Sequence, residues 1–101
     1  MDVSKLLSLM GIARKAGKVT FGYDTVTDSI FKKKARLIIL TSDLSSRSKR
    51  KIESVAKENN VRVLSINVSM NEIYSAIGKS TGIVCINDDG FARTMLDIIS
   101  N

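Results

Sequence analysis

Residues 14–40 read RKAGKVTFGYDTVTDSIFKKKARLIIL, and this stretch decides the fold. It indicates a helix end, a glycine, a short strand over Lys18–Phe21, a second glycine that opens a helix over Asp24–Lys33, and a strand over Leu37–Thr41. The last strand is so apolar that both of its faces are expected to be buried. Cations lie at both ends of the unit, and a helix that starts at a glycine leaves backbone N–H groups free to meet an anion. This arrangement favours a polyphosphate ligand such as RNA over a small metabolite.

The alternation of helix and strand continues to the end of the chain. It predicts one α/β domain over residues 1–101, a three-layer α/β/α sandwich whose four-stranded mixed sheet has helices on both faces. We expect one strand to run antiparallel at an edge of this sheet. Helical spacing of apolar residues and short apolar runs predict, in chain order, a helix over Ser4–Ala16, a helix over Ser46–Asn59, a strand over Val61–Ile66, a helix up to Ile77, a strand over Ile83–Ile86 and a helix over Phe91–Ile99.

Several helix ends carry capping signals. Ser4 is the expected N-cap of the first helix, and Ser69 with Glu72 three residues later forms a capping-box pattern. Asp88 and Asp89 are expected to start the last helix, because acidic side chains favour the positive end of the helix dipole. In the helix after the second glycine, the predicted inward-facing residues are Val26, Ile30 and Phe31.

The composition argues against an enzyme. The chain has no histidine, which is the commonest general acid or base, and it has no phosphate-binding loop motif of the Walker or GxGxxG type. Its single cysteine, Cys85, lies in an apolar run and is expected to be a buried core residue rather than a nucleophile. Cysteines and carboxylates do not occur at metal-ligand spacing, so we expect neither a metal site nor a cofactor.

The chain also shows no sign of a membrane or secretory role. No apolar stretch approaches the roughly 20 residues that span a bilayer, and no signal-peptide pattern is present. One cysteine cannot form an intrachain disulfide, which suits a reducing compartment. These features predict a cytoplasmic protein that does not bind membranes, and we expect a monomer.

Charge is concentrated in the first part of the chain. The net charge is +6, and residues 1–40 carry eight Lys or Arg against three acids, whereas residues 61–101 carry three against four. Such polarity is typical of nucleic-acid binding. The cations of the third helix are expected to form a solvated face outside the site: Arg47, Lys49, Arg50 and Lys51.

Five motifs follow one another along the chain: Arg14–Lys18, Gly22-Tyr23, Lys34–Leu40, Ile77–Lys79 and Asp88–Ala92. Together they resemble the kink-turn-binding ribosomal protein family, which includes large-subunit proteins seven and thirty of archaea and eukaryotes and the Gadd-like proteins. The likeness extends over nearly the whole chain and is greatest to the small bacterial members of the YlxQ type. It implies an α/β/α sandwich that binds kink-turned RNA, ribosomal or riboswitch, without catalysis or cofactor.

The resemblance further implies that the helix after Gly22 enters the widened major groove of the kink, where its first turn reads sheared G·A pairs. The family pattern there is roughly Gly-x-[Asn/Lys]-[Glu/Gln]-x-x-Lys. Gly22 matches the glycine, whereas Asp24, Thr25 and Asp28 occupy the three base-reading positions. An ionised Asp cannot donate to guanine O6 or N7, so this chain departs from the pattern. The alternative is that Asp24 and Asp28 only favour the positive end of the helix dipole.

The second contact implied by the resemblance is the loop before the strand at residue 83, whose apolar tip packs on a flipped-out nucleotide in relatives. Ile83 is the only bulky candidate here, and it is alternatively the first core residue of the strand. Another function remains open, namely a protein-interaction module of the same fold that contacts ribosomal proteins. The complete set of expected RNA-binding residues is Arg14, Lys15, Lys18, Gly22, Tyr23, Asp24, Thr25, Asp28, Lys32, Lys33, Lys34, Arg36, Thr81, Gly82 and Ile83.

Overall fold

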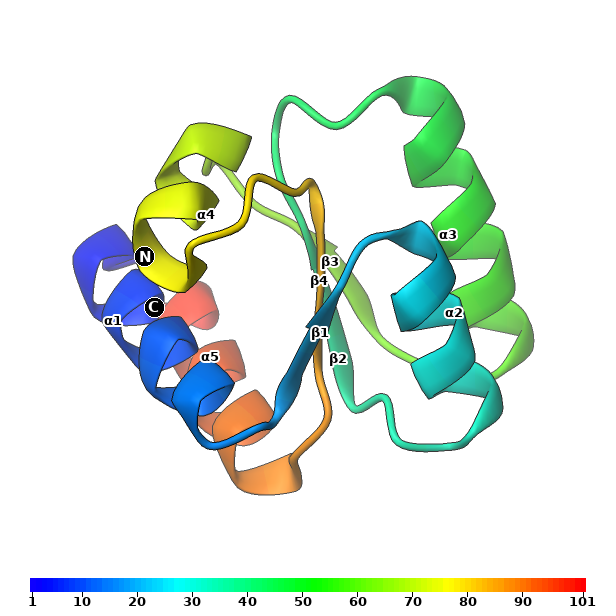
Figure 1. The fold of residues 1–101 in the computed structure, drawn as a ribbon, viewed down its shortest axis with the longest axis horizontal. Coiled ribbons are helices and arrows are strands. Elements are labelled where there is room, and N and C mark those ends of the chain that lie inside the picture. The colour runs from blue at the N-terminus through cyan, green and yellow to red at the C-terminus, as the bar shows by residue number, and fades with distance from the viewer.

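Four short strands form the central sheet, in the order β1-β4-β2-β3, and five helices cover it (Figure 1). The structure is a computed structural model that describes residues 1–101. The fold is the α/β sandwich that the sequence predicts. The elements are α1 (Val3–Lys15), β1 (Val19–Phe21), α2 (Tyr23–Phe31), β2 (Leu37–Leu40), α3 (Ser46–Glu58), β3 (Val63–Ser65), α4 (Met70–Ile77), β4 (Ile83–Ile86) and α5 (Asp89–Ser100).

Strand β4 runs antiparallel to both of its neighbours, whereas β2 and β3 are parallel. The reversed strand is therefore inside the sheet, and the expectation of an antiparallel edge strand was wrong. The reason lies in burial. All four residues of β4 are buried, which needs a partner on each side, whereas the half-buried residues of β1 tolerate an edge.

Two helical layers enclose the sheet. Helices α1, α4 and α5 cover one face, and α2 and α3 cover the other (Figure 1). Strand β2 supplies both cores by alternation, since Leu37 and Ile39 pack under the first layer and Ile38 and Leu40 under the second. All four side chains are fully buried, as the sequence predicts for a strand covered on both faces.

The capping signals were partly right. Ser69 and Glu72 form the expected capping box of α4, and the Asp88 carboxylate accepts from the Phe91 N–H at 2.9 Å to start α5. The N-cap of the first helix is Asp2 and not the expected Ser4. The Asp2 carboxylate accepts from the Lys5 N–H at 3.0 Å, and the helix begins at Val3. A carboxylate at this end also gains from the helix dipole, which the hydroxyl of Ser4 does not.

Helix α2 buries a narrower stripe than predicted. Val26 and Ile30 are buried, but Phe31 is 64% exposed and does not belong to the core. Phe31 is the last residue of the helix, where the chain turns away from the sheet. No helix of the structure is long and apolar enough to cross a membrane.

Thr41, at the end of β2, has a buried hydroxyl without a partner. The residue is 4% exposed, and its Oγ1 makes no hydrogen bond. The backbone N–H of Thr41 is satisfied by the Gly82 carbonyl at 3.1 Å, so only the hydroxyl is orphaned. A buried polar group without a partner lowers the stability of the fold.

We therefore predict that Thr41→Val, which keeps the side-chain shape and removes the hydroxyl, raises the free energy of unfolding by about 1 kcal/mol. Urea denaturation measures the change. The matched control is Thr20→Val, because the Thr20 hydroxyl is bonded to Ser29 and Asn87 and its removal leaves partners unsatisfied. A less stable Thr41→Val protein contradicts the prediction.

Candidate nucleic-acid interface

Helix α2 begins without a side-chain cap. Gly22, its N-cap residue, has a φ of 87°, a conformation that favours glycine. The N–H of Gly22 donates to the Ile83 carbonyl at 3.0 Å, which holds the start of the helix against β4. The first-turn N–H groups beyond it meet no capping side chain and remain available to an external acceptor. The other four helices are capped by the side chains of Asp2, Ser45, Ser69 and Asp88.

The loop before β4 lies beside this helix start, and its last residues, Thr81–Ile83, are held against the fold. The Thr81 hydroxyl contacts the backbone N–H and carbonyl of Ile83 at 3.2 and 3.1 Å. Gly82 is buried, and a Cβ there would lie 2.7 Å from Leu44 Cδ1. Ile83 is 4% exposed and packs in the core. Of the two alternatives for Ile83, the core residue is therefore correct, and the loop carries no bulky apolar tip.

Arg14 joins the last turn of α1 to the same region. Its guanidinium lies over the ring of Phe21, 5.2 Å from the centroid, directly before Gly22. The guanidinium also lies near Gly78, where the loop begins. Lys15, the next residue, lines the hollow between α1 and α4 together with Arg14, and it also extends along a second groove between the same two helices.

A polar groove of about 440 Å³ runs between β1 and α2. Its floor is a hydrogen-bonded network in which the hydroxyls of Thr20 and Ser29 are 2.9 Å apart and the Asn87 amide donates to Thr20 at 3.1 Å. No hydrophobic side chain lines the groove, so it suits a hydrated, charged ligand. The lining residues are Gly17, Lys18, Thr20, Thr25, Asp28, Ser29, Lys32, Lys34 and Asn87.

Only part of the lysine run borders this groove. Lys32 and Lys34 line it together with Lys18 from the start of β1, whereas Lys33 lines a separate groove beside Asn60. The split arises because Lys33 has a φ of 59°, which reverses the chain at the end of α2. Lys32 forms an ion pair with Asp28 at 2.9 Å, so the unpaired rim cations are Lys18 and Lys34.

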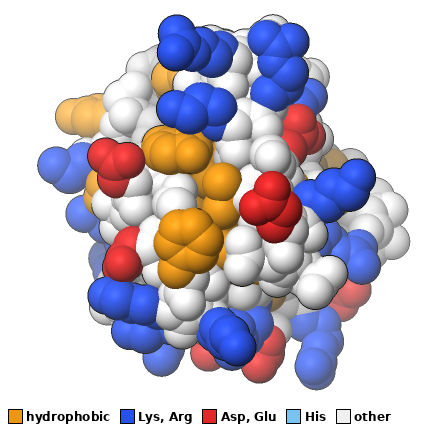
Figure 2. Space-filling view, turned by 90° about the vertical axis from the view of Figure 1, so that its right-hand side faces the viewer, with side chains coloured by type: hydrophobic (Ala, Val, Ile, Leu, Met, Phe, Trp, Pro, Cys, Tyr) orange, Lys and Arg blue, Asp and Glu red, His pale blue; other side chains and the backbone are white.

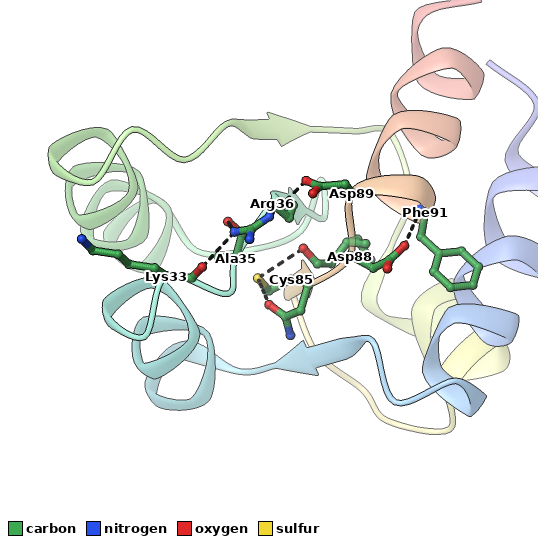
Figure 3. A network of polar contacts seen from close by, with 9 residues as sticks. Lys33, Ala35, Arg36, Cys85, Asp88, Asp89 and Phe91 are labelled. Carbon is green, nitrogen blue, oxygen red and sulfur yellow. Dashed lines mark hydrogen bonds and ion pairs between the residues drawn. The ribbon is translucent and has the colours of Figure 1, made fainter.

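Arg36 is used by the fold. Its Nε contacts the Asp89 carboxylate at 3.0 Å, and its Nη1 donates to the carbonyls of Lys33 and Ala35 at 2.9 and 3.3 Å (Figure 3). The side chain thus connects the start of β2 to the end of α2 and the start of α5. RNA binding by Arg36 stays a prediction, and these contacts compete with it.

The residues predicted from the family resemblance to read bases lie on the first turns of α2. Asp24, Thr25 and Asp28 are all exposed, and the last two border the groove. Tyr23 is half-buried, and the Lys51 ammonium of α3 lies 4.6 Å from its ring centroid. This contact could not be predicted from the sequence, because nothing in the spacing of the two residues brings α3 beside the start of α2.

The thiol of Cys85 joins the hydrogen-bonded network in the floor of the groove through Asn87. Cys85 is buried and donates to the Asn87 side-chain oxygen at 3.2 Å (Figure 3). Burial raises the pKa of Cys85 from 9.0 to about 11, since the thiolate would lose its hydration. No group of three or more His, Cys, Asp or Glu side chains is placed to hold a metal ion.

Residues 4–95 match a protein family that is described as "Ribosomal protein L7Ae/L30e/S12e/Gadd45 family". The RNA-binding protein YlxQ of Enterococcus faecium is 30% identical over 95 residues, which cover 94% of this chain and 91% of that protein. The large ribosomal subunit protein eL30 of Euphorbia esula is 31% identical over 80 residues, which cover 79% and 71%.

Solved structures agree with the fold. A protein of unknown function from Bacillus halodurans superimposes with a TM-score of 0.88 at 26% identity, covering 96% of this chain and 98% of that one. The 15.5kD RNA binding protein of Giardia lamblia superimposes with a TM-score of 0.77 at 17% identity, covering 99% and 87%. This second likeness concerns the fold alone.

The position of Cys85 leads to a reactivity prediction. With a pKa of about 11 the buried thiol stays protonated at pH 8, so its thiolate fraction is about 100-fold lower than in the unfolded chain. We predict that iodoacetamide alkylates native Cys85 at least about 100-fold more slowly than the urea-denatured protein at this pH. Mass spectrometry of timed samples measures the rate, and equal rates in the two states contradict the burial of β4.

Proposed function

This chain belongs to the ribosomal protein L7Ae/L30e/S12e/Gadd45 family, and from that premise we propose that it is a non-enzymatic, cytoplasmic RNA-binding protein of the kink-turn type. The observation that carries the proposal is the uncapped start of α2 at Gly22. Its free N–H groups, the guanidinium of Arg14 and the groove cations Lys18 and Lys34 lie along one side of the molecule. The ligand class is structured RNA, ribosomal or kink-turn.

Phosphate contact is the main source of affinity in this proposal. Helix α2 has nine residues and is therefore about 13 Å long, so its start and the lysines near its end are close enough for one RNA backbone to contact both. Lys18 and Lys34 make no ion pair within the chain and keep their charge for phosphates. The exposed hydroxyl of Thr25 offers a further hydrogen bond within the groove, whereas the Thr20 hydroxyl is already bonded to Ser29 and Asn87.

Base recognition is weaker than the family pattern implies. Asp28 replaces the lysine of that pattern, and its carboxylate forms an ion pair with Lys32. The side chains of both are 59% exposed, so the pair contributes little to stability and remains open to competition from phosphate. Asp24, one turn earlier, accepts hydrogen bonds only. We infer a protein that binds a bent RNA chiefly by its backbone.

One observation favours the alternative function, a protein-interaction module of the translation machinery. The α2–α3 face carries an apolar stripe on its surface, and Phe31 is 64% exposed (Figure 2). Basic polarity favours RNA over this alternative. Binding to protein-free ribosomal RNA separates the two, because an interaction module has no affinity for the naked RNA.

The first prediction concerns the groove cations. Lys18→Gln with Lys34→Gln removes the two unpaired rim charges, so the slope of log affinity against log salt should become shallower by about 1.5 from a wild-type value near −4. Fluorescence anisotropy with a kink-turn RNA over a range of salt measures both slopes. The control is Lys33→Asn with Lys57→Gln, which removes the same charge outside the groove, and Asn tolerates the positive φ of residue 33. An equal effect of the two double variants means that attraction is diffuse.

The second prediction concerns Asp28. Asp28→Lys releases Lys32, removes a negative charge and adds a donor for guanine O6 or N7, so a kink-turn RNA should bind more tightly by about 1–3 kcal/mol. The substitution Asp28→Asn serves as the control, because it removes the charge and adds no cation. A matched RNA without the G·A pairs should gain less from Asp28→Lys. If kink-turn binding is unchanged or weaker, α2 does not enter the groove of the RNA.

A further inference from the structure

Helix α3 begins with an unusual concentration of positive charge. Its first six residues include four cations, Arg47, Lys49, Arg50 and Lys51, and no acid precedes Glu53. The positive end of the helix dipole repels these side chains, and like charges three or four residues apart repel one another. The fold gains no ion pair in return, because the two ion pairs of the structure join Asp28 to Lys32 and Arg36 to Asp89. Three of the four cations, Arg47, Lys49 and Arg50, therefore cost stability without an ion pair or ring contact in return.

The sheet places this basic turn at the same end of the molecule as the start of α2. Strands β1 and β2 end there and β4 begins there, since Gly22 bonds to Ile83 and Thr41 bonds to Gly82. Four residues after Thr41, Ser45 caps α3. The start of α3 thus lies across the sheet end from the start of α2. Figure 2 shows Lys and Arg side chains gathered above the apolar stripe, at the end of this face where α3 begins.

A direct contact links the two helix starts. Lys51 extends over the ring of Tyr23, the first residue of α2, with 4.6 Å between the ammonium and the centroid. Arg47 is one helical turn before Lys51 and so shares its side of α3. The contact covers one face of the ring, which leaves Tyr23 poorly placed to stack on a base and makes it a platform that holds a cation. Lys51 therefore places a positive charge of α3 beside the start of α2.

We propose that the first two turns of α3 bind the phosphate backbone of an RNA stem that continues beyond the site at Gly22. The inference rests on the proposed function and adds a second contact, which the sequence assigned to a solvated face. The contacting groups are the charged ends of Arg47, Arg50 and Lys51, all of them exposed. They offer charge and donors without an exposed aromatic platform, so the contact is to phosphate and is independent of base sequence. An RNA restricted to the kink reaches Lys51 beside the start of α2, and the contacts with Arg47 and Arg50 require a longer stem.

The test compares RNAs of two lengths. The short RNA is a kink-turn with minimal stems. Each of two longer RNAs has one of its two stems lengthened by about ten base pairs, which adds phosphates without changing the kink. The variant is Arg47→Gln with Arg50→Gln, because neither side chain makes an ion pair whose loss would disturb the fold. The charge-matched control is Lys57→Gln with Arg62→Gln, which lies at the end of α3 and before β3. Circular dichroism verifies that both variants are folded.

We expect wild type to bind one lengthened RNA at least several-fold more tightly than the minimal RNA. The α3 variant should lose this gain, with a log–log salt slope shallower by about 1.8 on the lengthened RNA and affinity for the minimal RNA unchanged. Equal loss on both RNAs overturns the inference in favour of diffuse attraction. If the α3 variant binds every RNA as wild type does, the inference is also overturned, and the proposed function remains intact. Polyglutamate is titrated as an acidic-protein probe. If the α3 variant loses affinity for polyglutamate alone, the surface binds an acidic protein and the inference is overturned. If wild type binds neither RNA, the proposed function itself fails.

Discussion

Strand β4 lies between β1 and β2, and its backbone hydrogen bonds fix the positions of both ends of the candidate surface. At its first residue, Ile83 accepts from the Gly22 N–H and thereby holds the start of α2. Beyond its last residue, Asn87 donates to the Lys18 carbonyl, which brings that lysine and the Asn87 side chain into the groove. Because β4 is antiparallel to both neighbours, residues far apart in sequence meet at each of its ends. The surface exists only when this strand is in place.

Burial of β4 also decides the chemical state of its cysteine. The strand is fully apolar, so its cysteine behaves as a core residue with a pKa of about 11 rather than as a reactive group. Its thiol nevertheless donates to Asn87, and Asn87 donates to Thr20. These hydrogen bonds join β1, α2 and the end of β4 under the groove, between the backbone segments that carry Lys18 and Lys34.

The sequence predicted the elements well and their arrangement less completely. Strongly apolar strands such as Leu37–Leu40 and the box at Ser69 are local signals, and both were confirmed. The position of β4 depends on pairing between distant segments, which no local pattern records. Phe31 had the right spacing for the core but is the last residue of α2, where the helix no longer faces the sheet.

Side-chain roles at the candidate surface were harder to predict, because turns and long-range pairs decide them. Three consecutive lysines look equivalent in sequence, yet the positive φ of Lys33 turns it away from the groove that Lys32 and Lys34 line. The run of cations that includes Arg36 looks uniform too, yet the carboxylate of Asp89 engages that residue from the start of α5. Residue type alone therefore overstates the number of cations available to a ligand.

The distribution of charge over the helix starts bears on what kind of RNA the surface selects. Helix α2 has Asp24 in its first turn, which suits its own dipole, whereas α3 has cations in its first turns, which do not. An acid at the predicted base-reading position weakens discrimination by base identity, and unpaired cations on either side of it strengthen attraction for phosphate.

On the proposed arrangement, phosphates are bound both in the β1–α2 groove and on α3, with the start of α2 between them. A straight duplex contacts one of these surfaces at a time, and a bent RNA contacts both. On this proposal, selection depends on the bend of the backbone and not on base identity, which is compatible with Asp24 and Asp28 at the predicted base-reading positions.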